Sequence, residues 1–330
     1  MKRQNITLKS IKPLFIERMQ KLLSDKTDFN KYFKILNESP RKSIRCNALK
    51  ISPEELLKRL EKKGWKIKQP FKNYPEVMVI GSELSPGELG RSLEHLLGYY
   101  YVQEIASMLP VIALNPKPSE NETVLDLAAS PGSKTTQICA MMDNKGLILA
   151  NDVSWGRLKI LATNTNRCGC SNLIITKKDG VSLCKKFLTQ NIKFDKILLD
   201  APCSGEGTIR DKPGTLQMWN PKTIEVLSRL QKSLLVNALK ILNKNGELVY
   251  STCTHAPEEN EEILNFILNH EEFKKKIKIE KINLPIKCRS GITKWEDKTY
   301  SKEVENSCRI YPHDNDTEGF FLAKIRKIRD

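Results

Sequence analysis

The 330-residue sequence lacks the long apolar runs of a membrane protein, since no stretch of about 18 or more apolar residues occurs in it. Its first residues, MKRQNITLKSIKP, contain no apolar segment of about 7–15 residues, so we predict no secretory signal. Internal repeats and low-complexity tracts are absent as well. These absences argue against a membrane protein and predict a chain that works in the cytoplasm.

The nine cysteines lack the spacing of a metal site. No Cys-x-x-Cys pair occurs, and the closest two, Cys168 and Cys170, have no second pair nearby, so we expect no bound metal. Without an export signal, most thiols are expected to be free. Seven of the nine are expected to be ordinary packing residues: Cys46, Cys139, Cys168, Cys170, Cys184, Cys288 and Cys308.

Two phosphate-binding motifs are absent from DLAASPGSKTTQI (126–138), a stretch that reads as a strand, a tight turn and a helix start. A P-loop needs Gly directly before its Lys, where Ser133 stands, and a further Gly where Leu127 stands. The dinucleotide motif G-x-G-x-x-G fails because Gly132 is the only glycine present. A ligand held here is therefore expected to be nucleotide-like but bound without a phosphate cradle.

The basic charge of the chain is unevenly distributed. The formal net charge is +16; residues 1–97 hold 21 Lys/Arg against 11 Asp/Glu, and residues 98–330 hold 34 against 28. A basic surface attracts a polyanion such as nucleic acid, although lysine-rich surfaces also serve solubility alone. Charge by itself leaves both interpretations open.

Alternating strands and helices predict the fold of residues 98–330. Apolar runs that end in polar or small residues occur at 122–129, 146–152, 172–179, 194–202 and 246–253, and the longest helical stretch is expected at 220–246. This order predicts a parallel α/β sheet with helices on both faces. Such sheets bind ligands at the carboxyl ends of their strands, which is where these residues stand: Asp126, Asp152, Asp179, Asp200, Cys203 and Cys253.

The first third of the chain predicts a separate small module. Helices are expected at 14–23, 52–64 and 91–98, and short strands at 42–51 and 65–71. A strand–helix–strand unit on a basic background suits RNA handling. We therefore predict two domains, an α+β RNA-binding module at 1–97 and an α/β domain at 98–330.

Acidic residues at successive strand ends favour a ligand with hydroxyl and amino groups, and S-adenosylmethionine is such a ligand. Asp152 is placed for ribose hydroxyls and Asp179 for an adenine amino group, although an isolated aspartate is more often a turn residue or a helix cap. The turn before the helix brings its backbone close to a ligand through Ala128, Ala129, Ser130, Pro131, Gly132 and Ser133.

Two cations nearby have competing interpretations. Lys134 stands in a first helical turn, where the helix dipole disfavours a cation, so we expect it to contact Asp126 or the active site rather than only solvent. Arg157 either orients the cofactor or an acid, or forms an ordinary surface ion pair.

Several long motifs resemble one known family. They are DLAASPGSKTTQI, NDVSWGRLKIL, DAPCSGEGTIR, YSTCTHAPEENEEIL and EGFFLAKIRK, and they are similar to motifs of the RNA cytosine-C5 methyltransferases of the Nop2/Sun (RsmB/Trm4-like) group. The resemblance covers residues 98–330, with weaker support in RCNALKISPEELL. Ser130 stands where the family usually has alanine and Thr254 where serine is common; His255 is less expected and is given no role. The resemblance implies a Rossmann-like methyltransferase sheet, S-adenosylmethionine as cofactor, and RNA, tRNA rather than rRNA, as substrate.

The chemistry explains why such an enzyme carries two thiols. Carbon 5 of a pyrimidine is a poor nucleophile, and a thiolate that bonds to carbon 6 makes carbon 5 enamine-like and able to accept a methyl group. The resemblance implies that Cys253 is this nucleophile and that Cys203 assists product release. Asp200, which we also count with the cofactor contacts, is expected to hold N3 of the base.

Three alternatives remain open at this point. Cys203 can be the attacking thiol, as the analogous cysteine is in DNA C5 methyltransferases. The chain can be an N-methylating enzyme, although those usually carry an NPPY-like turn where this sequence has DAPC. It can also be an inactive RNA-binding protein, although both thiols and the cofactor loop argue against that. No exposed apolar stripe indicates an oligomer, so we predict a monomer.

Overall fold

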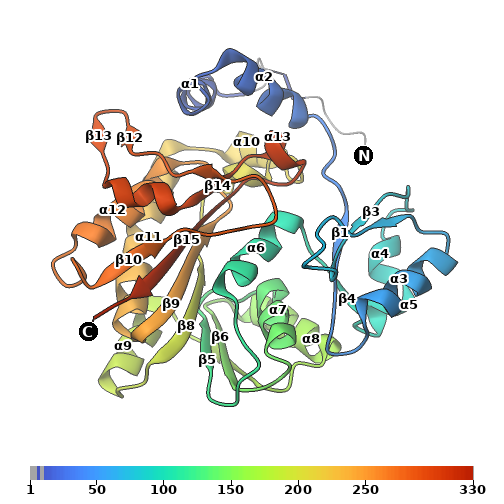
Figure 1. Ribbon diagram of the computed structural model, residues 1–330. Coiled ribbons are helices and arrows are strands. Elements are labelled where there is room, and N and C mark those ends of the chain that lie inside the picture. The colour runs from blue at the N-terminus through green and yellow to red at the C-terminus, as the bar shows by residue number, and fades with distance from the viewer. Residues whose placement is uncertain (1–5, 8–10, 330) are drawn as a thin grey trace.

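The larger domain is built on one mixed sheet. The computed structural model describes residues 6–7 and 11–329 (Figure 1). Its parallel strands lie in the order β9-β8-β5-β6-β7, with bounds β5 (Thr123–Asp126), β6 (Leu147–Asp152), β7 (Leu173–Lys177), β8 (Phe194–Asp200) and β9 (Leu242–Thr252). Antiparallel strands continue beyond β9: β15 (Phe320–Lys327), β14 (Cys308–Ile310), β11 (Arg289–Ser290) and, paired with β15, β10 (Ile277–Glu280). The predicted parallel α/β sheet is confirmed, and the antiparallel half is an addition.

Helices cover both faces of this sheet, as predicted. Neighbouring residues of a strand point to opposite faces, so Leu125 belongs to the core under α9 (Gly180–Thr189), α11 (Pro221–Lys240) and α12 (Glu261–Asn269). Val124 belongs to the opposite core, under α6 (Ile105–Leu114) and α7 (Ser133–Met141). Figure 1 shows the two groups of helices on opposite sides of the strands. A smaller cluster holds α8 (Trp155–Cys168) against β6.

A second, four-stranded antiparallel sheet lies near the N-terminus. Its order is β2-β3-β1-β4, with β1 (Ser43–Cys46), β2 (Ile67–Lys68), β3 (Val77–Ile80) and β4 (Tyr100–Val102). Helix α3 (Pro53–Lys62) buries Leu56 and Leu60 against it, and the Ser52 hydroxyl caps this helix by accepting from the N–H of Glu55. Two short helices, α4 (Glu88–Arg91) and α5 (Leu93–Leu96), precede β4. The predicted strand–helix–strand unit is present, and β3 completes it.

Helices α1 (Pro13–Leu22) and α2 (Lys26–Ile35) pack on the larger domain rather than on the small sheet. Phe15 meets Trp219 edge to face, with ring centroids 5.3 Å apart. The guanidinium of Arg289 bonds both oxygens of Asp28, at 2.5 and 2.8 Å. Figure 1 shows α1 and α2 above α10 (Gly214–Met218) and α13 (Pro312–Asn315). The predicted division into two domains at residue 97 stays a prediction. Strand β4 of the small sheet lies after this residue, and α1 and α2, which precede it, pack on the later part of the chain.

Two expectations from the sequence are wrong in detail. The long helix begins as predicted, with Asn220 accepting from the N–H of Lys222, but it ends at Lys240, and Gly246 lies inside β9. Cys288 and Cys308 are not separate packing thiols, because they form a disulfide across β11 and β14. The other seven cysteines are free.

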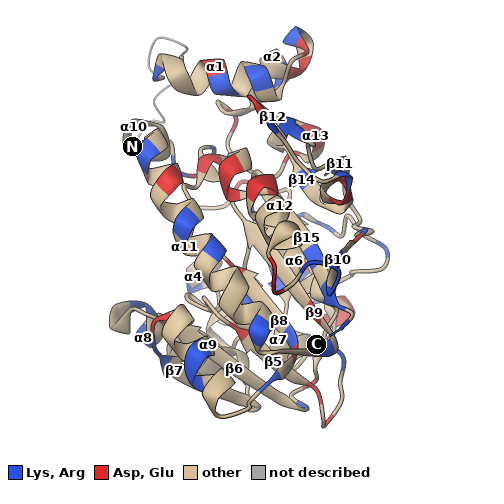
Figure 2. Ribbon diagram, turned by 90° about the vertical axis from the view of Figure 1, so that its left-hand side faces the viewer, with Lys and Arg blue, Asp and Glu red and all other residues tan. Residues whose placement is uncertain are grey.

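The remaining elements are short. A two-stranded ribbon comprises β12 (Lys294–Trp295) and β13 (Lys298–Thr299). Figure 2 shows Lys and Arg along α9 and α11 and a concentration of acidic residues near α12. Among residues 6–7 and 11–329, no helix is both long and apolar enough to cross a bilayer. Part of MKRQNITLKSIKP, where we predict no export signal, lies outside these residues.

Candidate active site

The turn after β5 brings the start of α7 to the carboxyl edge of the sheet. Gly132 has a φ of +104°, and a Cβ there would stand 2.9 Å from Leu161 Cδ1, so this position requires glycine. Helix α7 begins at the next residue, Ser133. Asn151 ties the turn to its neighbour, because its amide donates to the carbonyl oxygens of Leu127 and Lys178. The local turn and the long-range amide together fix the loop.

A hollow of about 290 Å³ opens beside this turn. Among the predicted cofactor residues, those that line it are Ala128, Ser130, Asp152, Arg157, Asp179 and Asp200. Ala129, Pro131, Gly132, Ser133 and Lys134 do not line it, and they build the turn and helix behind it. Cys203 and Cys253 line the same hollow.

Polar groups in and beside the hollow suit a ligand with hydroxyl and amino groups. The buried Ser130 hydroxyl and one oxygen of Asp126 have no hydrogen-bond partner in the described protein. Burial raises the pKa of Asp126 to about 7, although the Thr135 hydroxyl donates to its other oxygen. Asp152 is buried at the end of β6, and Arg157 lies 3.5 Å from its carboxylate. Asp179 is exposed and caps α9 by accepting from the N–H of Ser182, which is the ordinary role the sequence left open.

The two cysteines are in direct contact. Their sulfur atoms lie 3.1 Å apart, and the backbone N–H of Cys253 donates to the sulfur of Cys203 at 3.2 Å. The hydrogen bond with Cys253, followed by burial, raises the pKa of the Cys203 thiol well above its usual range. Cys203 is therefore the thiol of the pair that holds its proton tightly, and the sulfur of Cys253 is in contact with it.

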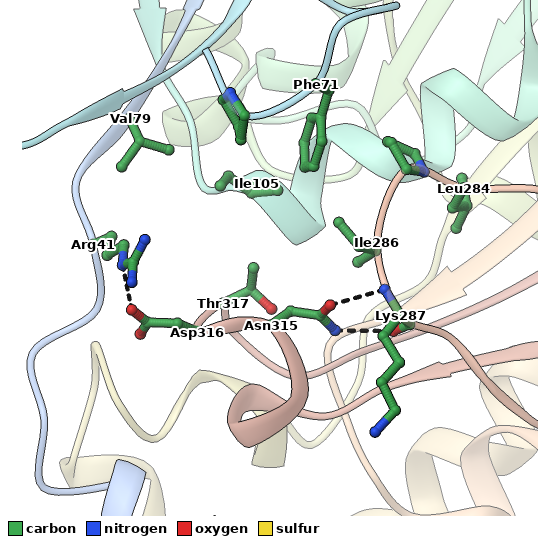
Figure 3. Close-up of a pocket in the computed structure, with 12 residues that line it drawn as sticks. Arg41, Phe71, Val79, Ile105, Leu284, Ile286, Lys287, Asn315, Asp316 and Thr317 are labelled. Carbon is green, nitrogen blue, oxygen red and sulfur yellow. Dashed lines mark hydrogen bonds and ion pairs between the residues drawn. The ribbon is translucent and has the colours of Figure 1, made fainter. Parts of the chain in front are cut away.

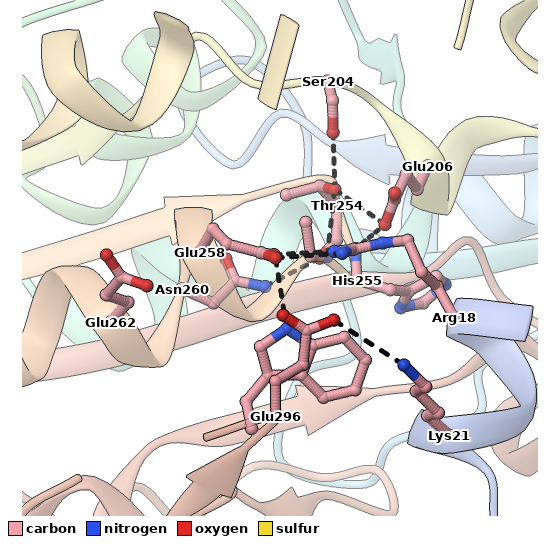
Figure 4. Close-up of polar contacts among 12 residues, drawn as sticks. Arg18, Lys21, Ser204, Glu206, Thr254, His255, Glu258, Asn260, Glu262 and Glu296 are labelled. Carbon is pink, nitrogen blue, oxygen red and sulfur yellow. Dashed lines mark hydrogen bonds and ion pairs between the residues drawn. The ribbon is translucent and has the colours of Figure 1, made fainter. Parts of the chain in front are cut away.

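Hydrogen bonds join the loops that carry the two cysteines. The hydroxyls of Ser204 and Thr254, each directly after a cysteine, lie 2.8 Å apart (Figure 4). Glu206, in the short helix η2 (Glu206–Thr208), accepts from the Thr254 hydroxyl and the His255 N–H, both at 3.2 Å. The N–H of Gly207 donates to the carbonyl of Cys253 at 2.9 Å. The loops are thus fixed to each other, and the thiols with them.

Asp200 lies at the end of β8 between two donors. Lys134 Nζ is 2.7 Å from Oδ2, and the Ser251 hydroxyl donates to Oδ1 at 2.7 Å. Lys134 also donates to the Ser107 hydroxyl and lies 5.3 Å from the centre of the Phe320 ring. Lys134 therefore contacts Asp200 rather than Asp126, and the acid stays oriented at the edge that carries the thiols.

Comparison with known proteins identifies the family. A family model described as 16S rRNA methyltransferase RsmB/F matches residues 111–326, and one described as the N-terminal domain of 16S rRNA methyltransferase RsmF matches residues 11–105. The chain belongs to the RsmB/RsmF family. The resemblance to Nop2/Sun-like RNA cytosine-C5 methyltransferases drawn from the sequence is thereby confirmed.

Individual relatives of this RsmB/RsmF-family chain support the same conclusion. The tRNA (cytosine(49)-C(5))-methyltransferase of Pyrococcus abyssi is 40% identical over 321 residues, 97% of this chain and 98% of the relative. Ribosomal RNA small subunit methyltransferase F of Erwinia tasmaniensis is 38% identical over 96% of this chain, and the chain spans only 63% of its length. The crystal structure of NSun6 from Pyrococcus horikoshii with SFG has a TM-score of 0.79 at 28% identity, covering 98% of this chain and all of that one.

His255 has a structural place in this RsmB/RsmF-family chain. Its ring is buried, stacks on Tyr311 with centroids 5.0 Å apart, and lies so close to Gly319 that a Cβ there would approach it to 2.3 Å. Burial, with smaller contributions from Arg309 and His313, lowers the pKa of His255 to about 3, so the ring is neutral. It packs behind the cysteine loop rather than facing the hollow that the thiols line.

Three residues that hold the loops of the two thiols are not predicted from the sequence. Glu206, Gln231 and Glu259 are buried and bond to the cysteine loops. Glu206 and Glu259 stand within the motifs DAPCSGEGTIR and YSTCTHAPEENEEIL, but nothing in those motifs assigns them a role. Their partners lie 28 to 55 residues away, so no local pattern reveals them.

Two further hollows are lined by residues near the small sheet together with residues of later segments. One of about 550 Å³ lies between Phe71 and Ile105 on one side and Leu284 and Lys287 on the other; in Figure 3, Asn315 already bonds the backbone of Lys287. The other, about 1070 Å³, borders residues 39–43 and the loop at 208–214. Neither contains a cysteine, and among the described residues no group of His, Cys, Asp and Glu is arranged to hold a metal.

Proposed function

We propose that this protein methylates C5 of cytosine in RNA, tRNA in preference to rRNA, through a covalent bond between Cys253 and C6 of the base. The observation that carries the proposal is the contact of two thiols, 3.1 Å apart, at a hollow that also holds Asp152 and Asp200. The name of the Pyrococcus abyssi relative supports tRNA, and its length matches that of this chain. The name of the Erwinia relative, a longer protein, supports rRNA.

S-adenosylmethionine is the proposed cofactor, and the hollow fits it. The family implies this cofactor, and the NSun6 structure carries SFG, an analogue of it. Asp152 at the end of β6 is placed for ribose hydroxyls, while the unpartnered Ser130 hydroxyl and the peptide groups of the turn offer further contacts. When bound, the cofactor supplies the electrophilic methyl group.

In the proposed reaction, the thiolate of Cys253 bonds to C6 of the cytosine, and the electron pair of the C5–C6 double bond moves through the ring toward N3. The Asp200 carboxyl, oriented by Lys134 and Ser251, donates a proton to N3 and takes it back when carbon 5 is methylated. Carbon 5 is then enamine-like and takes the methyl group. A base then removes the C5 proton, the electron pair of that C–H bond restores the C5–C6 double bond, and the bond between C6 and the Cys253 sulfur breaks. Cys203, in contact with the leaving sulfur, assists this step.

The small sheet and the basic charge support an RNA substrate. A base attacked at C6 must be reached from both faces, so it comes from a single strand or is flipped out of a helix. We also propose that the chain works as a monomer in the cytoplasm, where its seven free thiols stay reduced. Sedimentation of the purified protein tests the monomer.

Transfer of an isotopic methyl group from S-adenosylmethionine to separate tRNA and rRNA pools tests the proposal. We expect label in tRNA, recovered as 5-methylcytidine after digestion. Label in rRNA alone would reverse the substrate preference, and label on a base nitrogen would favour the N-methylating alternative. No label in either pool would favour the inactive RNA-binding protein.

A further inference from the structure

The backbone on both sides of Cys203 is held by one buried pair of side chains. The amide of Gln231, on α11, donates to the carbonyl of Pro202 at 2.8 Å. The carboxylate of Glu259, at the end of the short helix η3 (Pro257–Glu259), accepts from the N–H of Ser204 at 3.0 Å. These are the peptide groups that directly precede and follow Cys203.

The two side chains also bond to each other. Gln231 donates to the same oxygen of Glu259 at 2.8 Å, so one amide nitrogen serves both Pro202 and Glu259. Both residues have no exposed surface. The Tyr250 hydroxyl donates to the backbone carbonyl of Glu259 at 2.6 Å, which fixes the backbone of Glu259 from the β9 side. We call the Gln231–Glu259 pair the bracket. It connects α11, η3 and β9 to the loop of Cys203.

The pair leaves two buried acceptors without partners, Gln231 Oε1 and Glu259 Oε1. Core positions that tolerate such groups incur a desolvation penalty, so a merely structural role is better served by apolar side chains. The hydrogen bond with Cys253 and burial are the larger causes that raise the pKa of the Cys203 thiol, and the Glu259 carboxylate adds to them by placing negative charge nearby.

We infer that Glu259 and Gln231 are positioning residues for Cys203, which fix its backbone and hold a buried carboxylate beside it, so that Cys253 is the thiol that attacks. This inference rests on the proposed division of labour between the two thiols. It adds the residues that determine which of the two sulfurs, only 3.1 Å apart, attacks the base.

The selection depends on pH in a defined direction. Burial raises the pKa of Glu259 to about 7, against hydrogen bonds from Ser204 and Gln231. Besides Cys203, the titratable groups that act on or are affected by Glu259 are Glu206 in η2 and Tyr250 on β9. Above pH 7 Glu259 is charged and opposes the Cys203 thiolate; below pH 7 this opposition weakens.

The test is chemical and needs no RNA. The full-length protein reacts with limiting iodoacetamide at pH 6 to 8.5, and mass spectrometry gives the ratio of alkylated Cys253 to alkylated Cys203. In the wild type we expect this ratio to rise at least five-fold through pH 7. In Glu259→Gln, which keeps the shape and the acceptor for Ser204, the ratio should fall at least five-fold at pH 8 and stay flat with pH. Glu225→Gln, which makes the same change at an exposed acid on α11, the helix that carries Gln231, is the matched control and should follow the wild type.

A second variant separates the effect of the Glu259 charge from that of the hydrogen bond between Gln231 and the backbone of Pro202. Gln231→Leu removes the donor to Pro202 and should lower the alkylation ratio while circular dichroism shows a folded chain. Wild-type ratios in both variants would overturn the inference. If Cys203→Ala meanwhile traps RNA as an adduct, the proposed function stands without the bracket; if alkylation follows the expected pattern but no variant traps RNA, the bracket stands and the proposed function fails.

Discussion

Replacing Cys203 by alanine should turn a transient bond to RNA into a lasting one. Its sulfur lies 3.1 Å from that of Cys253, close enough to act on the group that leaves. Assistance by a positioned acid or base typically contributes about 10²–10⁴-fold to a rate, or roughly 3–5 kcal/mol. Release should slow by that factor, whereas attack by Cys253 and methyl transfer need nothing from Cys203. The enzyme should therefore accumulate in its methylated, RNA-bound form.

The fold should tolerate this change. Cys203 is only partly buried, and its removal leaves the N–H of Cys253 without the sulfur acceptor at 3.2 Å, an effect of about 1 kcal/mol. A thermal unfolding midpoint a few degrees lower would fit a defect confined to the site. The loops stay joined through Ser204 and Thr254.

The assay is a denaturing gel of protein incubated with labelled RNA and S-adenosylmethionine. We expect Cys203→Ala to run as a slower, RNA-labelled band that nuclease treatment removes, and the double variant with Cys253→Ala to show none. Cys170→Ala, another partly buried thiol remote from the hollow, should behave as the wild type. If Cys203→Ala loses methylation and forms no adduct, the two thiols do not divide the reaction as proposed. An adduct through Cys203 in a Cys253→Ala protein would support the opposite assignment.

Three other outcomes are expected. Cys253→Ala should lower methyl incorporation by more than about 10³-fold without a large change in affinity for S-adenosylmethionine, because it removes the nucleophile alone; full activity would reject its role. Asp126→Asn should stabilise the apo protein more at pH 8 than at pH 5. In the wild type the folded-state pKa of Asp126 is raised to about 7, so the folded chain binds an extra proton and its free energy of unfolding falls by up to about 4 kcal/mol as pH rises from about 4 to 7. The variant lacks this loss, and denaturant titration at the two pH values measures the difference. Asp28→Asn should loosen α1–α2, which would be seen as faster hydrogen exchange in these helices, because it removes the ion pair with Arg289. Hydrogen bonds with Arg289 lower the pKa of Asp28 to about 2, so the wild-type contact is lost only as pH falls from about 4 through 2. Unchanged exchange would show that apolar packing alone holds the two helices in place.

Local patterns predicted the elements and the edge at which the site forms. Ser52 and Asn220 are caps that act within three residues, and both begin helices as expected. Alternation of strands and helices was enough to place Asp152, Asp200, Cys203 and Cys253 at one edge, because parallel strands end on the same side. Contacts between distant segments were beyond this reasoning. The Cys288–Cys308 disulfide depends on the pairing of β11 with β14. Lys134 forms its ion pair with Asp200 rather than with Asp126, which is nearer in sequence.

The same limit explains Gly246, the last residue of the helix predicted at 220–246. It lies where β9 shifts its pairing with β8: Phe194 stands opposite Leu242, but Lys196 stands opposite Glu247. The irregularity adds three residues to the offset, and a Cβ on Gly246 would approach two carbonyl oxygens, those of Asn243 and Asp195, to 2.8 and 2.9 Å.

The consequence of this shift reaches the active site at the far end of the strands. With the shifted register Asp200 pairs with Ser251, which is the residue that orients its carboxylate. The two cysteines follow this pair by three and two residues and therefore emerge side by side. With the register of Phe194 continued, Asp200 would face Leu248 instead, and Cys253 would be displaced along the strand by three residues, or roughly 10 Å, relative to its present place beside Cys203. The bulge near the start of β8 and β9 is thus what brings two sulfurs, 50 residues apart in sequence, into contact.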